Sequence, residues 1–183
     1  EGGAALVVVA RIEGGGVRAP GALMAVSASS ERAGYISGGC IDADVVLHAR
    51  KALESGEAAW LRYGAGSCFI DLPLPCGGMI EVLILPRPDA ALVAACHGTL
   101  AARQPALLCF SPDGRIVGPE TADPHLSFRY EPKLRLRIAG RGADCLALAR
   151  LALASGIDAR LFLRDDADME EARWLGFTAI EPL

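Results

Sequence analysis

The sequence predicts an α/β protein with two domains, a mixed α/β domain over residues 1–131 and a Rossmann-like domain over residues 132–183. Three observations favour this class. The 183 residues are 52% hydrophobic but only 5% aromatic, a balance typical of α/β proteins. Short apolar segments of strand length alternate with helical patterns. A glycine-containing turn after residue 139 joins a predicted strand to a predicted helix.

A glycine-rich loop over residues 14–21 separates two predicted strands, residues 5–12 and 22–26. Its three consecutive glycines expose backbone N–H groups that can surround an anion, and Arg18 adds a forked cationic donor. The loop is not a Walker P-loop, because the Gly-Lys-Ser/Thr ending is absent. The alternative is a hairpin tip with a solvated arginine, and the residues alone leave both interpretations open.

The next feature is the segment Ser37-Gly38-Gly39-Cys40, which a helical pattern follows at once, up to Ser55 and a glycine stop at Gly56. The helix is expected to begin at Cys40, so that the thiol lies in the first turn. Unpaired N–H groups and the macrodipole favour an anion there, which makes such a thiol a good metal ligand or nucleophile. The glycine pair before it lets a bulky partner approach the backbone.

A second cysteine, Cys76, precedes a second glycine pair, Gly77 and Gly78, in mirrored order. Taken alone, either half is better explained as a tight turn with a buried structural cysteine. Together with the loop that carries Arg18, the two halves indicate one binding site. The residues expected to converge on one pocket are Arg18, Gly38, Gly39, Cys40, Cys76, Gly77 and Gly78.

The rest of the first domain is expected to hold two further strands, a helix and a hairpin. The strands are residues 58–63 and 79–85, and the second of them carries one charged residue, Glu81. The helix covers residues 89–103 and begins with Asp89 as its cap. A Ser-Pro-Asp-Gly turn joins residues 106–110 to 115–117 as a hairpin.

The second domain resembles half of a dinucleotide-binding unit, with strands over residues 134–139 and 159–163 and a helix over 146–155 between them. Gly140 and Gly142 are candidate nucleotide contacts, and Asp165 lies where a ribose-binding carboxylate is expected. Cys145 replaces the third glycine of the turn, and Asp144 would place negative charge near a pyrophosphate. The domain is expected to be incomplete, since only about 20 residues follow the second strand.

Charge and hydropathy exclude several classes of protein. The net charge is −4 and no basic block occurs, so nothing supports binding to nucleic acid. No apolar segment reaches the roughly 20 residues of a membrane span. The six cysteines are scattered along a chain that does not need disulfides, and we interpret them as reduced thiols of a cytoplasmic protein.

Four segments resemble the XdhC/CoxI family of accessory and maturation factors of xanthine dehydrogenase and carbon monoxide dehydrogenase. They occur in the order and at the spacing of that family. The segments are residues 17–24 (VRAPGALM), 37–40 (SGGC), 63–64 (YG) and 75–82 (PCGGMIEV). The strand and turn over residues 134–142 lie where the family begins its Rossmann-like domain.

The resemblance implies a chaperone that binds molybdenum cofactor (molybdopterin), protects it during sulfuration and inserts it into a xanthine dehydrogenase-type apoenzyme. It implies a molybdenum hydroxylase and a cysteine desulfurase as partners, a homo-oligomer, and an accessory factor rather than a catalyst. Asp42 stands where the family has a longer Glu. The cofactor-binding residues implied are Arg18, Pro20, Gly21, Gly38, Gly39, Cys40, Asp42, Cys76, Gly77 and Gly78, with Cys40 as a molybdenum ligand.

The chemistry of the first domain suits that role independently. Soft thiolates suit the metal, while glycine loops and an arginine suit the phosphate and the pterin. Two other classes stay open. One is an oxidoreductase that uses NAD(P) or a flavin nucleotide over residues 140–165, and the other is a non-catalytic interaction module in which the glycine and cysteine segments are structural.

Overall fold

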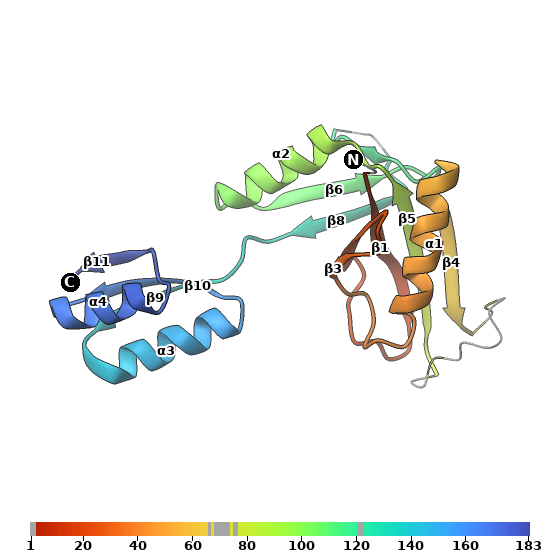
Figure 1. Ribbon diagram of the computed structural model, residues 1–183. Coiled ribbons are helices and arrows are strands. Elements are labelled where there is room, and N and C mark those ends of the chain that lie inside the picture. The colour runs from red at the N-terminus through yellow and green to blue at the C-terminus, as the bar shows by residue number, and fades with distance from the viewer. Residues whose placement is uncertain (1–2, 66, 68–73, 75–76, 121–122) are drawn as a thin grey trace. The chain divides into compact units, whose positions relative to one another are not determined.

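The computed structural model describes residues 3–183 apart from residues 66, 68–73, 75–76 and 121–122. The chain divides into two compact units, Glu1–Glu131 and Pro132–Leu183, each a mixture of helices and strands (Figure 1). Within the described residues, no helix is long and apolar enough to cross a membrane.

The first unit is built on a five-stranded antiparallel sheet with the order β3-β2-β1-β5-β4 (Figure 1). The sheet buries both faces of its central strands, which explains why the sequences of β1 and β5 are almost continuously apolar. The strands are β1 (Ala4–Glu13), β2 (Leu23–Ser27), β3 (Arg32–Gly34), β4 (Ala59–Gly64) and β5 (Met79–Pro86).

The helix α1 (Asp42–Ser55) covers one face of this sheet. Successive residues of a strand point to opposite faces, so Val7 and Val9 pack toward α1 whereas Val8 packs on the other side. The helix contributes its apolar stripe to the first core, and its end is fixed by Gly56, which has φ +77°.

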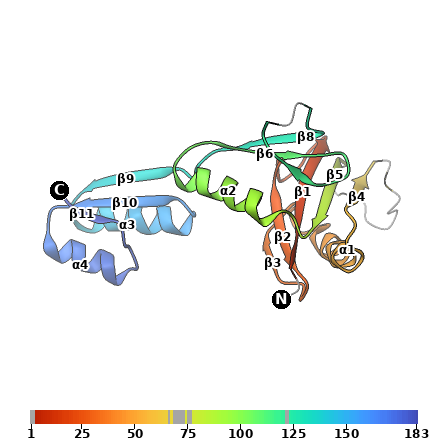
Figure 2. The same cartoon turned by 90° about the horizontal axis from the view of Figure 1, so that it is seen from above.

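A second, smaller layer covers the opposite face of the sheet (Figure 2). It consists of a three-stranded antiparallel sheet of order β7-β6-β8 and the helix α2 (Ala90–Ala101). Phe110 of β6 is fully buried in the core that this layer shares with β1 and β5. The strands are β6 (Ala106–Phe110), β7 (Ile116–Val117) and β8 (Leu126–Tyr130).

The second unit is a parallel three-stranded sheet of order β11-β10-β9 with two helices on one face (Figures 1 and 2). Leu161 and Leu163 are fully buried between this sheet and the helices. The elements are β9 (Arg135–Gly140), α3 (Gly142–Ala154), β10 (Asp158–Leu163), α4 (Asp166–Trp174) and β11 (Ile180–Pro182).

Most of the predicted elements are confirmed, including the parallel pairing of β9 with β10 and the cap on α2, where the Asp89 carboxylate accepts from the amides of Ala91 and Leu92. The predicted start of α3 at residue 146 is wrong, because the helix begins at Gly142. Its first turn is largely exposed and carries no apolar periodicity. The sequence patterns also missed β3, β8, α4 and β11.

Candidate functional site

The glycine-rich loop connects β1 to its antiparallel neighbour β2 and ends in a tight turn. The amide of Gly21 donates to the carbonyl of Val9 at 2.7 Å, and the amide of Ala22 donates to the carbonyl of Ala19 at 3.1 Å. These bonds anchor the carboxyl end of the loop on the sheet. The predicted candidates Arg18 and Pro20 therefore lie on a segment whose backbone is fixed by the strands that flank it.

Within the described residues, Nε of Arg18 is a buried side-chain nitrogen without a hydrogen-bond partner. This Nε–H donates to no acceptor in the described part of the chain, although the guanidinium lies 4.5 Å from the centroid of the Tyr35 ring. Buried donors are nearly always satisfied. The side chain lines a cavity of about 620 Å³ between the loop and β8, so a bound anion or carbonyl there would supply the missing acceptor.

The segment that follows β3 lies against this loop. A Cβ built on Gly38 would be 3.3 Å from Cγ2 of Val17, which shows that the Val17 side chain packs closely against the backbone at Gly38. A second cavity, of about 380 Å³, is lined by Arg32, Tyr35 and the glycine pair Gly38-Gly39, among others. Tyr35 lines one cavity and Arg18 the other, so their stacked pair lies between the two.

Asp42 organises the segment before α1. Its carboxylate is only 2% exposed and accepts from the amides of Ile36 at 3.1 Å and Gly39 at 3.2 Å, and from the hydroxyl of Ser37. Burial alone would raise the pKa of Asp42, but the Ser37 hydroxyl and the backbone amides outweigh it and lower that pKa. Both oxygens are thus used inside the protein, which favours a structural role over direct contact with a cofactor.

Cys40 lies outside the helix, contrary to the prediction that the helix begins there. The first helical residue is Asp42, the cap is Ile41, and the first turn carries Asp42 and Asp44. The physical reason is that the amides of Ile36 and Gly39 donate to the Asp42 carboxylate. These bonds hold the segment before Asp42 in a loop, so that the helix cannot begin at Cys40. Cys40 is instead exposed on that loop, where its thiol is accessible to a ligand but does not lie in the helix.

The second glycine pair reaches the other end of the glycine-rich loop. The Cα of Gly78 would be 3.1 Å from a Cβ built on Gly14, and Gly64 lies against the carbonyl of Gly78. Gly77 immediately precedes it, whereas Cys76 lies outside the described residues. The loop over residues 14–21 therefore touches Gly78 at its beginning and Tyr35 and Gly38 at its middle.

The strand β8, which sequence reasoning missed, holds the loop from the far side. The hydroxyl of Tyr130 donates to the carbonyl of Gly21 at 2.7 Å, and a Cβ on Gly21 would be 3.0 Å from the ring of Phe128. Gly21 also has φ +86°, so glycine is required there for structural reasons. Burial, and secondarily Cys96, raises the pKa of the Tyr130 hydroxyl, which remains a donor at neutral pH. The alternation of Leu126, Phe128 and Tyr130 was the available signal for this strand.

Tyr130→Phe tests this support directly. We expect a loss of about 1 kcal/mol in the free energy of unfolding, because the Gly21 carbonyl loses one hydrogen bond. Urea denaturation measures this loss. Tyr35→Phe is a matched control, since the Tyr35 ring is about half exposed and still stacks on Arg18 without its hydroxyl. An equal loss in both variants would contradict a specific role for Tyr130.

In the second unit, the three nucleotide-binding candidates lie at the carboxyl ends of the parallel strands. Gly140 is the last residue of β9, Gly142 is the first residue of α3, and Asp165 is the residue before α4. Asp165 is exposed. Across the described residues of both units, no group of three His, Cys, Asp or Glu side chains is arranged to hold a metal ion.

Comparison with known proteins shows which family and which protein the chain resembles. Residues 1–64 match the model of the XdhC and CoxI family. The chain is also 32% identical over 167 residues to the molybdenum cofactor insertion chaperone PaoD of Escherichia coli (strain K12), a match that covers 87% of this chain and 52% of PaoD. Residues 1–64 are thus similar to the XdhC and CoxI family, and most of the chain is similar to part of PaoD. The residues that the family model matches include Arg18, Tyr35 and Cys40.

A solved structure supports the fold of the chain. A crystal structure described as a xanthine dehydrogenase from Bacillus halodurans superposes with a TM-score of 0.80 at 20% identity. The match covers 98% of the present chain and 64% of that protein. The chain thus spans about half the length of PaoD and somewhat under two thirds of the solved structure.

Proposed function

We propose that this chain binds molybdenum cofactor at the site formed by the 14–21 loop and residues 35–40, and inserts it into a xanthine dehydrogenase-type molybdenum hydroxylase. Two findings support the proposal. One is the 32% identity with a molybdenum cofactor insertion chaperone. The other is the buried Nε of Arg18, which has no acceptor within the described structure and belongs to a residue that lines the cavity of about 620 Å³.

Each residue of the site has a chemical task in this proposal. Bound cofactor would supply a metal held by a dithiolene, for which a soft thiolate such as that of exposed Cys40 is a suitable ligand. Arg18 would donate in a fork to a phosphate or a pterin carbonyl. Tyr35 holds the Arg18 guanidinium in place by stacking. Gly38 and Gly39 leave room for the cofactor at the backbone.

Asp42 and Tyr130 would act on the cofactor only through other residues. Asp42 holds the Ser37–Gly39 segment through its hydrogen bonds, and Tyr130 holds the loop at Gly21. Both would position the binding residues without touching the ligand. Since Gly21 is already explained by its packing against Phe128, we assign it the same structural task.

The substitution Arg18→Lys tests whether the Arg18 guanidinium binds the cofactor. Lysine keeps the charge but loses the planar fork, so we expect retention of molybdopterin to fall about tenfold, as for the loss of one charge-assisted hydrogen bond. Retained pterin is measured by its fluorescence after oxidation. Arg11→Lys is the matched control, because Arg11 belongs to the same hairpin but is exposed and paired with Glu13. Equal retention in the parent and both variants would contradict the assignment of Arg18.

The delivery step is tested by mixing the cofactor-loaded chain with a molybdenum hydroxylase apoenzyme and measuring the activity that appears. We expect the loaded chain to activate the apoenzyme faster than the same amount of free cofactor. Activation at the same rate with and without the chain would contradict the chaperone function. The cysteine desulfurase partner and the homo-oligomer that the family resemblance implies stay predictions.

A further inference from the structure

The glycine turn between β9 and α3 is fully explained by contacts within the second unit. Gly142 has φ +76°, a conformation that favours glycine whether or not a ligand is present. A Cβ on Gly140 would be 2.6 Å from Sγ of Cys145. The two glycines that predicted a nucleotide site are therefore both required by the backbone and by the packing of Cys145.

The amide that a pyrophosphate would use is already occupied. In a dinucleotide-binding turn, the backbone at the second glycine and the helix N-terminus bind the pyrophosphate. Here the second glycine is Gly142, and its N–H donates to Oδ2 of Asp168 at 2.5 Å. Asp168 lies in the first turn of α4, so a carboxylate of the neighbouring helix takes the place of the anion.

We infer that the carboxylate of Asp168 closes the N-terminus of α3, so that the second unit does not bind NAD(P) or a flavin dinucleotide at its glycine turn. Asp168 acts as an internal substitute for the phosphate and fastens α3 to α4. This inference is independent of cofactor binding by the first unit, since it rests only on residues of the second.

Two further features of the turn oppose a dinucleotide, and one is compatible with it. Asp144 adds a second negative charge in the first turn of α3, which would repel a pyrophosphate. The Cys145 thiol fills the space next to Gly140 where the third glycine normally allows close packing. Asp165, the residue before α4 and two positions after the end of β10, lies where a ribose-binding carboxylate is expected. The strand–turn–helix–strand arrangement of a nucleotide site is thus present, but the carboxylate of Asp168 occupies the place of the pyrophosphate.

The experiment combines ligand binding with amide exchange on the full chain. Titration calorimetry with NAD⁺, NADPH and FAD is expected to show no saturable binding to the parent. Hydrogen exchange at the Gly142 amide, followed by NMR, is expected to become at least about tenfold faster in Asp168→Ala, since a hydrogen bond to a charged acceptor is lost. Asp168→Asn keeps an acceptor oxygen and should give a smaller increase, which provides a milder variant if Asp168→Ala unfolds.

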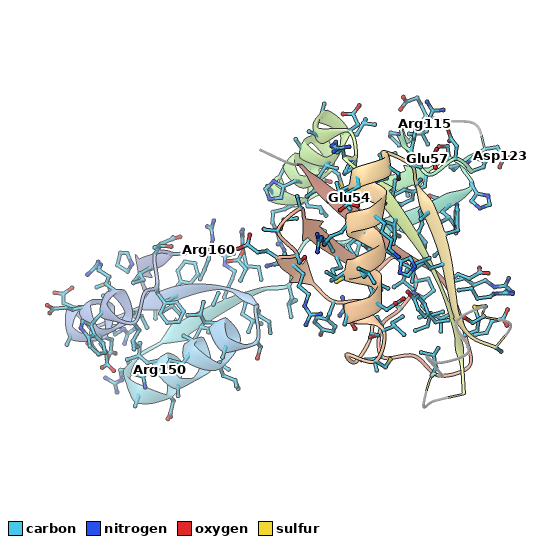
Figure 3. All side chains as sticks on the ribbon, turned by 45° about the vertical axis from the view of Figure 1, so that its right-hand side comes forward. Glu54, Glu57, Arg115, Asp123, Arg150 and Arg160 are labelled. Carbon is cyan, nitrogen blue, oxygen red and sulfur yellow. The ribbon has the colours of Figure 1, made fainter. Side chains whose placement is uncertain are left out.

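Glu171→Ala is the matched control. Glu171 also lies on α4 and contacts α3, through an exposed ion pair with Arg150 at 3.3 Å; Figure 3 labels Arg150 on this unit. Exposed pairs contribute little, so exchange at Gly142 should be unchanged. Saturable binding of a dinucleotide that shifts the Gly142 amide resonance would overturn the inference. So would equal exchange rates at Gly142 in the parent and Asp168→Ala.

Discussion

Replacing Asp42 by Ala is expected to lower the free energy of unfolding by about 3 kcal/mol, the largest stability effect of any single change at the site. The substitution leaves the amide of Ile36 and the hydroxyl of Ser37 without the carboxylate that accepts from them, and removes one of the two acceptors of the Gly39 amide, at a residue that is only 2% exposed. Urea denaturation measures the loss. Glu54→Ala is the control, because Glu54 is on the same helix but exposed, with one ion pair at 4.0 Å (labelled in Figure 3).

The pH dependence of stability gives a second test of the same carboxylate. Because the folded-state pKa of Asp42 is lowered from its ordinary value of 3.8, the native state binds its proton less readily than the unfolded state. The contribution is therefore fully present above the unfolded-state value and is lost as the pH falls through the lower folded-state pKa. We expect Asp42→Asn to flatten the parent's acid-side decline in stability, whereas an unchanged acid profile would show that Asp42 does not cause that decline.

Cys40→Ser is expected to have the largest effect on cofactor retention and almost none on stability. The thiol is exposed, and exposed substitutions usually change stability by less than about 0.5 kcal/mol. Serine replaces a soft ligand by a hard, protonated one, so cofactor retention should fall by more than about tenfold. Substitution of residues that only contact a metal ligand already lowers metal affinity by at least about tenfold.

The comparison variants for Cys40→Ser are Cys76→Ser and Cys109→Ser. Cys76 is the second candidate from the sequence, and Cys109 is a buried cysteine of β6. We expect Cys76→Ser to retain more cofactor than Cys40→Ser. Cys109→Ser should leave cofactor retention unchanged, because Cys109 is buried and its thiol contacts the hydroxyl of Ser127 on β8 at 3.7 Å. A larger loss of retention in Cys76→Ser than in Cys40→Ser would assign the functional thiol to Cys76 instead.

Periodicity and turn chemistry were sufficient for the elements whose packing is local. The apolar repeat of α1, its stop at Gly56, the Asp89 cap and the glycine-rich hairpin loop all follow from residues within one or two turns. The short strand β3 carries no such pattern, since it is three residues long and fully exposed. The strand β3 forms by pairing with β2, and the residues of β3 alone carry no pattern that predicts this pairing.

The residues that hold the binding segments in place were harder to predict from the sequence than the exposed residues of the site. Asp42 is on the apolar face of α1, three residues before Val45 and seven before Ala49, all buried. That position was an available signal that its carboxylate points inward. The bond from Tyr130 to Gly21 joins residues 109 positions apart, and the bond from Gly142 to Asp168 joins two different helices. Both depend on tertiary packing that the sequence does not display.

Binding of molybdenum cofactor by this chain is tested most directly by the pterin content of the purified protein. The protein is loaded anaerobically with molybdenum cofactor, separated from free cofactor by gel filtration, oxidised, and assayed for pterin fluorescence in the protein peak. We expect stoichiometric pterin that co-elutes with the parent chain and falls sharply in Arg18→Lys and Cys40→Ser. Pterin that elutes only as free cofactor, or that co-elutes equally with the parent and both variants, would contradict this expectation.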